Sequence, residues 1–157
     1  MTEEPQGGPG RAALHSAAAQ IGEQLAGRGR VLRGVVVDAP GAPGGGLTAD
    51  LAVVAPDARP DDRGRHPGAG VEAVLEAAGP HPAGTARAYA LGGIPLYVVV
   101  DTAAAVCTVH TAPSADGAYR EAERVPFGND LFLPLGGRTV VLRTDEFPTG
   151  PPTPGSV

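Results

Sequence analysis

Two acidic residues stand where an ordinary surface carboxylate is uncommon. Asp50 opens the apolar run DLAVV, and Glu72 lies at the start of the next apolar run, VEAVL. If these runs form neighbouring strands, the two carboxylates can converge at one end of a sheet. Mg²⁺ needs two or three such oxygens while it keeps several waters, and it can then activate water for phosphodiester hydrolysis. Spacing alone favours the plainer alternative, in which both acids contact solvent at strand ends.

Other reactive side chains occupy positions that are typical of structural roles. His15 is expected at the boundary of a helix and His110 within a strand, where a lone histidine is usually structural. Cys107, the only cysteine, is expected to be a small buried residue rather than a nucleophile. The segment 55–70 mixes Asp, Arg and His66. Alternating charges in such a Gly/Pro-rich loop are typical of a mobile, solvated segment rather than of a metal or phosphate site.

The elements that must position the two acids can be predicted from periodicity. Residues 11–26 have the best helical pattern, and Gly27 is placed to end that helix. Residues 71–78 fit either a helix or a strand. The first two predicted strands should form an antiparallel hairpin, and the third should pair with the fourth. The predicted strands are 31–38, 49–54, 96–101, 106–111, 119–126, 131–134 and 138–143, and a second helix is predicted over 83–91.

Composition limits the classes of function. A chain of 157 residues predicts one domain, over 11–148, with disordered tails at 1–10 and 149–157. The net charge is -5, which argues against a general attraction to nucleic acid but leaves room for a local basic groove. A single cysteine fits a reducing cytoplasm. The longest apolar runs fall far short of the ~20 residues of a membrane span, so no membrane partner is expected.

Several stretches follow one another in an order that is more specific than any one of them. They are GRGRVLRGVVVD, TADLAVV, VEAVL, ARAYALGGIPLYVVVD, GAYREAERVPFGNDLFLPL and RTVVLRTDEFP. Together they resemble the Uma-two family of restriction-endonuclease-like proteins, in the PD-(D/E)xK nuclease superfamily, over roughly residues 15–147. The family's Pro-Asp pair is here Ala49-Asp50. Its VEVLSP strand resembles VEAVL, which places Glu72 on the second metal-binding acid.

The resemblance implies an α/β (α+β) fold with a restriction-endonuclease-like mixed central sheet. An N-terminal helix and a short helix before the central strand belong to that fold. It further implies that Asp50 and Glu72 are the catalytic, metal-binding residues, that Mg²⁺ or Mn²⁺ is the cofactor, and that DNA is the substrate.

The chain departs from the family at the catalytic lysine. The family's lysine lies about one turn before the tyrosine that corresponds to Tyr89. Thr85 occupies that position here, His81 stands a turn earlier where aspartate is common, and all twelve basic residues of the chain are arginines. Arg87 is the nearest cation. Arginine holds its proton too tightly to act as a base, but it can bind a phosphate.

Three hypotheses follow. The first is a metal-dependent DNA endonuclease in which Asp50 and Glu72 hold the ion and Arg87 contacts phosphate. The second is a pseudo-nuclease without catalysis that acts as a binding or regulatory module, which the missing lysine favours. The third is a small partner-binding protein whose exposed edge strands form a homodimer. The sequence does not choose between an enzyme and a non-catalytic module.

Overall fold

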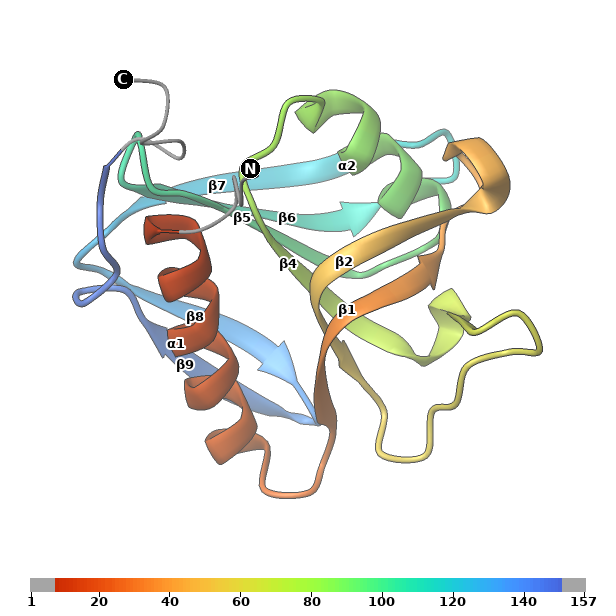
Figure 1. Cartoon of the computed structure of the whole chain (residues 1–157), viewed down its shortest axis with the longest axis horizontal. Helices are drawn as coiled ribbons and strands as arrows, with labels where there is room; N and C mark the ends of the chain where they lie inside the picture. Colours follow the sequence, from red (N-terminus) through yellow and green to blue (C-terminus); the bar gives the residue numbers. More distant parts are fainter. Residues whose placement is uncertain (1–7, 151–157) are drawn as a thin grey trace, which may run out of the picture.

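A seven-stranded mixed sheet, a separate two-stranded sheet and two α-helices make up the computed structural model, which describes residues 8–150 (Figure 1). The large sheet has the strand order β3-β1-β2-β4-β5-β6-β7, in which β1–β3 and β4–β5 are parallel and the other pairs antiparallel. The elements are α1 (Pro9–Leu25), β1 (Arg30–Asp38), η1 (Pro43–Gly45), β2 (Gly46–Val54), β3 (Arg65–His66), η2 (Gly68–Gly70), β4 (Val71–Ala77), α2 (Pro82–Leu91), β5 (Leu96–Asp101), β6 (Val106–Pro113), β7 (Tyr119–Pro126), β8 (Asp130–Leu135) and β9 (Arg138–Arg143).

Most predicted elements form where periodicity placed them. The predicted hairpin is β1–β2, and β5 pairs with β6 as expected. The segment that fitted either a helix or a strand is β4. Val71, Val74 and Leu75 are all buried, and burial on both faces of a sheet outweighs the helical propensity of this segment. The mixed α+β architecture with a helix before the buried strand β5 therefore matches the expected fold class.

The structure differs from the prediction at the start of α1 and in the segment 55–70. Helix α1 begins at Pro9, inside the segment expected to be a disordered tail, because proline is well tolerated in the first turn of a helix. The short strand β3 lies within the predicted solvated loop and pairs with β1. The parts of the predicted tails at 1–7 and 151–157 lie outside the described residues. Between residues 8 and 150, neither helix is both long and apolar enough to cross a membrane.

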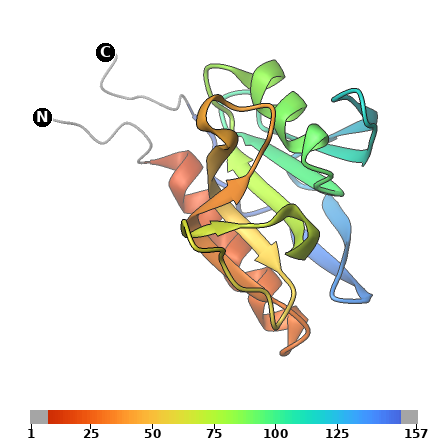
Figure 2. The same ribbon diagram turned by 90° about the vertical axis from the view of Figure 1, so that its right-hand side faces the viewer.

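The large sheet is covered on both faces. Helix α1 and the β8–β9 hairpin pack on one face, and α2 packs on the other (Figure 1, Figure 2). The strands of the sheet contribute alternate side chains to the two resulting cores. The core beneath α1 includes Leu14, Ile21, Leu25, Leu51, Val53, Leu75, Val98, Leu133 and Leu142, and the core beneath α2 includes Val37, Ala52, Val54, Val74, Tyr89, Ile94 and Tyr97.

Two glutamines of α1 complete the free edge of β9. The side-chain amide of Gln24 accepts a hydrogen bond from Val141 N at 2.8 Å and donates one to Val141 O at 2.7 Å. Gln20 does the same with Arg143 N and O, at 2.8 and 3.0 Å. Gln20 and Gln24 are one turn apart and Val141 and Arg143 are two residues apart, so the helix supplies the hydrogen bonds that another strand would make.

Replacing Gln24 with alanine should destabilise the protein by roughly 1–3 kcal/mol, because the edge amide of Val141 loses its partner. The exposed neighbour Glu23 offers a matched control on the same helix, and Glu23→Ala should cost less than about 0.5 kcal/mol. Urea unfolding of both variants measures the difference. Equal losses would mean that the glutamine contacts contribute no stability.

Candidate functional site

Strands β2 and β4 separate at Asp50. Their pairing runs from Leu51↔Leu75 towards Val54, and it stops before Asp50. Beyond that point the backbone amide of Ala77 donates a hydrogen bond of 3.1 Å to Asp50 Oδ2 instead of continuing the ladder. Glu76 follows Leu75 on β4, and the negative charge of Asp50 acts on its carboxyl, so the two acids are neighbours. An exposed and a partly buried carboxylate therefore meet where the two strands diverge.

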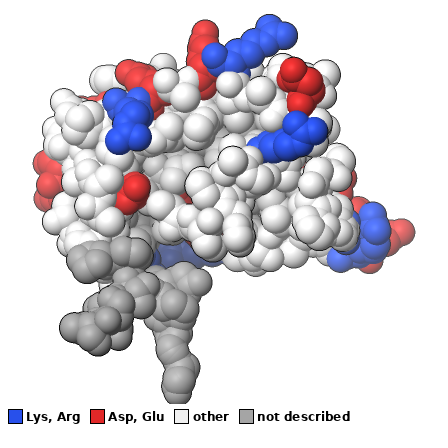
Figure 3. Space-filling view, turned by 90° about the horizontal axis from the view of Figure 1, so that it is seen from above, with Lys and Arg blue, Asp and Glu red and all other residues white. Residues whose placement is uncertain are grey.

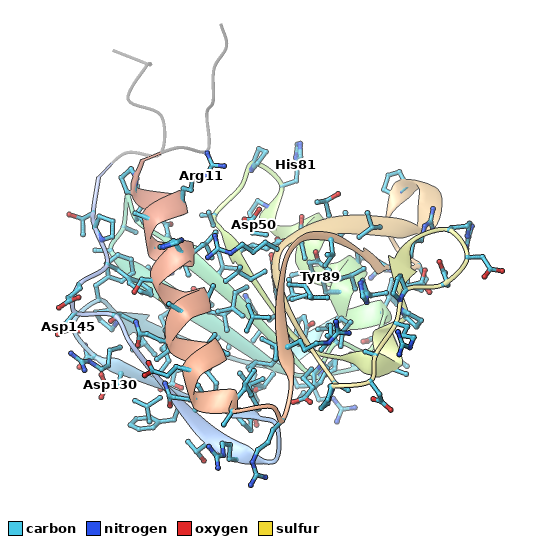
Figure 4. All side chains as sticks on the ribbon, turned by 60° about the horizontal axis from the view of Figure 1, so that its bottom comes forward. Arg11, Asp50, His81, Tyr89, Asp130 and Asp145 are labelled. Atoms are coloured by element: carbon cyan, nitrogen blue, oxygen red, sulfur yellow. The ribbon has the colours of Figure 1, made fainter. Side chains whose placement is uncertain are left out.

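Glu76 is held by two tyrosine hydroxyls. Tyr89 of α2 donates to Glu76 Oε2 at 2.9 Å, and Tyr97 of β5 donates to Oε1 at 3.1 Å. Burial raises the pKa of Glu76 to about 7; the Tyr89 hydrogen bond opposes that rise, and the negative charge of Asp50 adds to it. In Figure 4, Asp50 lies on the side of the molecule between His81 and Tyr89. A carboxyl that changes protonation near neutral pH, next to a second carboxyl, is a common feature of functional sites.

The tyrosines are rigidly packed. The ring centroid of Tyr97 lies 5.1 Å from that of Tyr89 and 5.4 Å from that of His110. Burial raises the pKa values of both tyrosines well above the ordinary range, so both hydroxyls keep their protons and act as donors to Glu76. His110 packs against Tyr97 and its pKa is lowered by burial, which agrees with the structural role predicted for this histidine.

Glu72 lies elsewhere on β4. The pairs Val53↔Ala73 and Val54↔Val71 leave Glu72 without a partner on β2, which is a β-bulge. Its Oε1 accepts a hydrogen bond of 2.7 Å from Gly136 N in the β8–β9 turn, beneath the face covered by α1. Glu72 and Glu76 are four positions apart, which is about 13 Å along the strand.

The predicted convergence of Asp50 and Glu72 therefore does not occur. Asp50 is in the middle of β2, one residue before the segment that pairs with β4, and Glu72 is near the start of β4. Because this pairing is antiparallel, the residue of β4 that approaches Asp50 lies just beyond Leu75, whereas Glu72 lies at the other end of the paired segment. The acid near Asp50 is therefore Glu76.

Arg87 also lies away from the carboxylates. Two helical positions correspond to a rotation of about 200°, so α2 directs Tyr89 towards Glu76 and Arg87 towards the β6–β7 turn. There the Arg87 guanidinium donates a hydrogen bond of 3.0 Å to Asp116 O and packs beside Gly117. Thr85, one turn before Tyr89, is uncharged and partly exposed.

A signal for Glu76 was present in the sequence. In the motif VEVLSP the acid precedes the proline by four residues. Glu76 precedes Pro80 by four residues, whereas Glu72 precedes it by eight. By this spacing, the residue that resembles the acid of the motif is Glu76 rather than Glu72. The hydrogen bonds from Tyr89 and Tyr97 to Glu76 could not be predicted from a local pattern, because the hydroxyls reach Glu76 only through tertiary packing.

The carboxylate oxygens at this site are suitable ligands for a hard cation that keeps most of its water. No group of three or more His, Cys, Asp and Glu side chains within residues 8–150 is placed to hold a metal. Two carboxylates do approach each other, and carboxylate oxygen is the ligand that Mg²⁺ and Mn²⁺ favour. Mg²⁺ usually binds through one or two carboxylates plus water and substrate phosphate. Asp50 and Glu76 therefore fit such an ion.

One side of Asp50 is open. The pairs Arg33↔Leu51 and Val35↔Ala49 place Gly34 of β1 next to Asp50. Gly34 has a φ of 62°, which favours glycine, and a Cβ added there would meet no atom within 4 Å. A ligand can therefore approach the carboxylates from the β1 side without meeting a side chain at position 34.

Comparison with known proteins supports the fold. No protein-family model and no curated protein matches the chain. A solved structure that is similar is that of a protein from Anabaena variabilis ATCC 29413, described as a "putative nuclease belonging to DUF820". The TM-score is 0.56 and the identity 13%, and the alignment covers 86% of this chain and 74% of the other. At this identity the similarity shows a shared fold.

Proposed function

We propose that this protein is a metal-dependent nuclease of the Uma-two type that hydrolyses DNA phosphodiesters. One observation carries the proposal: Asp50 and Glu76 lie side by side where β2 and β4 diverge, in a chain whose fold is similar to that of the protein from Anabaena variabilis described above. Glu76 takes the place that the sequence motif assigned to Glu72. Arg87 is left out of the phosphate contact because it faces the β6–β7 turn.

The residues of the site have two roles, metal binding and positioning of the metal ligands. Asp50 and Glu76 would hold Mg²⁺ or Mn²⁺. A bound ion of this kind supplies Lewis-acid stabilisation of phosphate charge and lowers the pKa of a bound water. The amide of Ala77 fixes the Asp50 carboxylate, and Tyr89 and Tyr97 fix Glu76. Because the pKa of Glu76 is about 7, this carboxyl is ionised and able to bind a cation above neutral pH.

The lack of lysine favours a second function, that of a non-catalytic module. The chain has no lysine, and the superfamily lysine helps to position the attacking water and to offset charge on the phosphate. Thr85 cannot do either. A non-catalytic module that retains the ion and the DNA contact but cleaves slowly or not at all is therefore the alternative function for the same pair of acids.

Both functions are tested by incubating supercoiled plasmid DNA with the protein and Mn²⁺, with Mg²⁺, or with EDTA. The nuclease proposal expects nicked circles that require the metal and that disappear in Asp50→Ala. Nicking that survives this substitution would indicate a contaminating nuclease and remove the support for the site. A wild-type protein that binds Mn²⁺ through Asp50 without nicking would establish the non-catalytic module.

The proposal extends to the setting in which the protein works. DNA is the expected partner, and the expected compartment is the cytoplasm. The compartment is supported by the single cysteine, Cys107, which is buried and whose pKa is raised to about 12 by burial. Such a thiol is unreactive.

The free edge strand β7 carries charges of both signs, since Arg120, Glu121, Glu123 and Arg124 are exposed, and charged edge strands resist self-pairing.

A further inference from the structure

A phosphate at this site needs positive charge nearby. The side chains that act on the pKa of Glu76 are Asp50, Tyr89 and Tyr97, which are acidic or neutral. The net charge of the chain is -5, and the face seen in Figure 3 shows acidic and basic side chains interspersed rather than gathered into one basic patch. Any phosphate contact must therefore come from a few well-placed cations instead of from a broad positive field.

Arg33 of β1 and His15 of α1 form such a local group. Arg33 Nη2 and His15 Nδ1 are 3.1 Å apart, and both residues are exposed. Arginine remains protonated in proteins, so Arg33 donates this hydrogen bond and the neutral ring of His15 accepts it. The His15 proton then resides on Nε2. The pair thus has free donors of two kinds, the remaining guanidinium N–H groups and the Nε2–H of the imidazole.

The pair stands next to the candidate site. Arg33 is paired with Leu51, the neighbour of Asp50, and it precedes Gly34, which leaves the side of Asp50 open. On the other element, α1 reaches the site at its first turn, where a Cβ on Gly10 would lie 3.3 Å from Ala77 Cβ. Arg33 and His15 therefore lie on the α1 side of the sheet, near the edge at which Asp50 stands, whereas Glu76 points to the opposite side with Tyr89 and Tyr97.

We propose that Arg33 and His15 together bind a backbone phosphate of DNA adjacent to the phosphate at Asp50 and Glu76. The inference rests on the proposed nuclease-type function, because it assumes that DNA lies across the two carboxylates. Phosphates on one strand recur at about 3.4 Å of helical rise, so a duplex at Asp50 presents further phosphates to a side chain on the neighbouring strand. The guanidinium supplies a permanent charge, and its hydrogen bond to His15 fixes the direction in which that charge points.

Arg11 extends the group. It is exposed and lies four residues before His15, hence on the same side of α1. Figure 4 shows Arg11 at the beginning of α1, on the side of the molecule where Asp50 lies. Its position predicts a contact to a more distant phosphate, weaker than that of Arg33 because no side-chain partner between residues 8 and 150 holds it.

The test is DNA binding, measured by fluorescence anisotropy with a short labelled duplex of random sequence in Ca²⁺ and in EDTA. Arg33→Gln should weaken binding about tenfold, since a charge-assisted hydrogen bond is lost. It should also reduce the slope of log affinity against log salt by about 0.9, the value of one phosphate contact. Arg33→Lys should restore the salt slope, because the charge returns, without restoring the full affinity, because the guanidinium fork is lost.

The matched control is Arg124→Gln, which removes an exposed arginine from the edge strand β7. It should change neither affinity nor salt slope by more than twofold. Equal effects of Arg33→Gln and Arg124→Gln, or an unchanged slope in Arg33→Gln, would overturn the proposal. Circular dichroism of each variant excludes unfolding. Absence of nicking by the wild type would refute the cleavage proposal while leaving the Arg33-dependent binding intact, so the two failures are distinguishable.

Discussion

Replacing Glu76 with glutamine should reduce Mn²⁺-dependent nicking by at least about 100-fold, whereas the same replacement at Glu72 should leave it within threefold of the wild type. Glu76 lies beside Asp50, and loss of one of two carboxylates removes half of the charge that would hold the ion. Even residues that only support a metal ligand cost 10–100-fold in affinity or activity when they are changed. Glu72 instead accepts a hydrogen bond from Gly136, which a glutamine oxygen can also accept.

The comparison is informative because both substitutions change glutamate to glutamine on one strand. Isothermal titration calorimetry with Mn²⁺ should accompany the plasmid assay, so that the prediction holds for a slow or inactive enzyme as well. Weak Mn²⁺ binding in Glu76→Gln with normal binding in Glu72→Gln is the expected pattern. The reverse pattern would return the second ligand to Glu72 and would require a rearrangement of β4.

Glu76→Gln should also make the metal-free protein more stable at alkaline pH. The folded-state pKa of Glu76 is about 7, against an ordinary value of 4.5. For an acid with a raised pKa, the folded state favours the protonated form. Its contribution to stability is fully present below about pH 4.5, decreases as the pH rises, and is lost above pH 7. Glutamine stays neutral and can still bond to both Tyr89 and Tyr97, so the variant does not suffer this loss.

The expected size follows from the pKa difference. Each pKa unit corresponds to about 1.4 kcal/mol, so the variant should be more stable than the wild type by roughly 3 kcal/mol at pH 8, or about 6–12 °C in melting temperature. At pH 4.5 the two proteins should differ by less than about 0.5 kcal/mol. Urea unfolding in EDTA at both pH values measures this.

The difference between variant and wild type isolates Glu76 from other titrating groups. Hydrogen bonds lower the pKa values of Asp61 and Asp116, and their contributions have the opposite pH dependence, but they cancel in the comparison. A variant that is less stable than the wild type at pH 8 would show that Glu76 is a structural carboxylate. Greater stability combined with lost Mn²⁺ binding would identify a residue retained for function at a cost in stability.

Local sequence patterns accounted for most of the fold. The helical spacing in α1 and the β-branched run of β5 predicted elements close to their observed bounds, since both patterns reflect which side of a local element faces the core. The segment 71–78 was ambiguous for the same reason. Its alanines and glutamates favour a helix, and only contacts with β2 and β5, which lie elsewhere in the chain, make it a strand.

The candidate site was predicted in part. The predicted strand 49–54 is only the second half of β2, which begins at Gly46, so Asp50 lies in the middle of the strand and its partner depends on the direction and register of β4. Neither can be derived from the order of acidic residues, because register is set by long-range hydrogen bonding and by the burial of alternate side chains. The same limitation applies to Arg87, whose direction depends on which side of α2 packs on the sheet.

What the sequence by itself determined is most of the elements, the absence of any lysine, and an aspartate directly before the buried run LAVV. Only the tertiary structure decided that Glu76 is the second carboxylate, that tyrosines from α2 and β5 hold it, and that Arg33 meets His15 across two elements. The physical reason is separation along the chain. Side chains 13 to 21 residues from Glu76 meet it only after β2, β4, β5 and α2 have packed together.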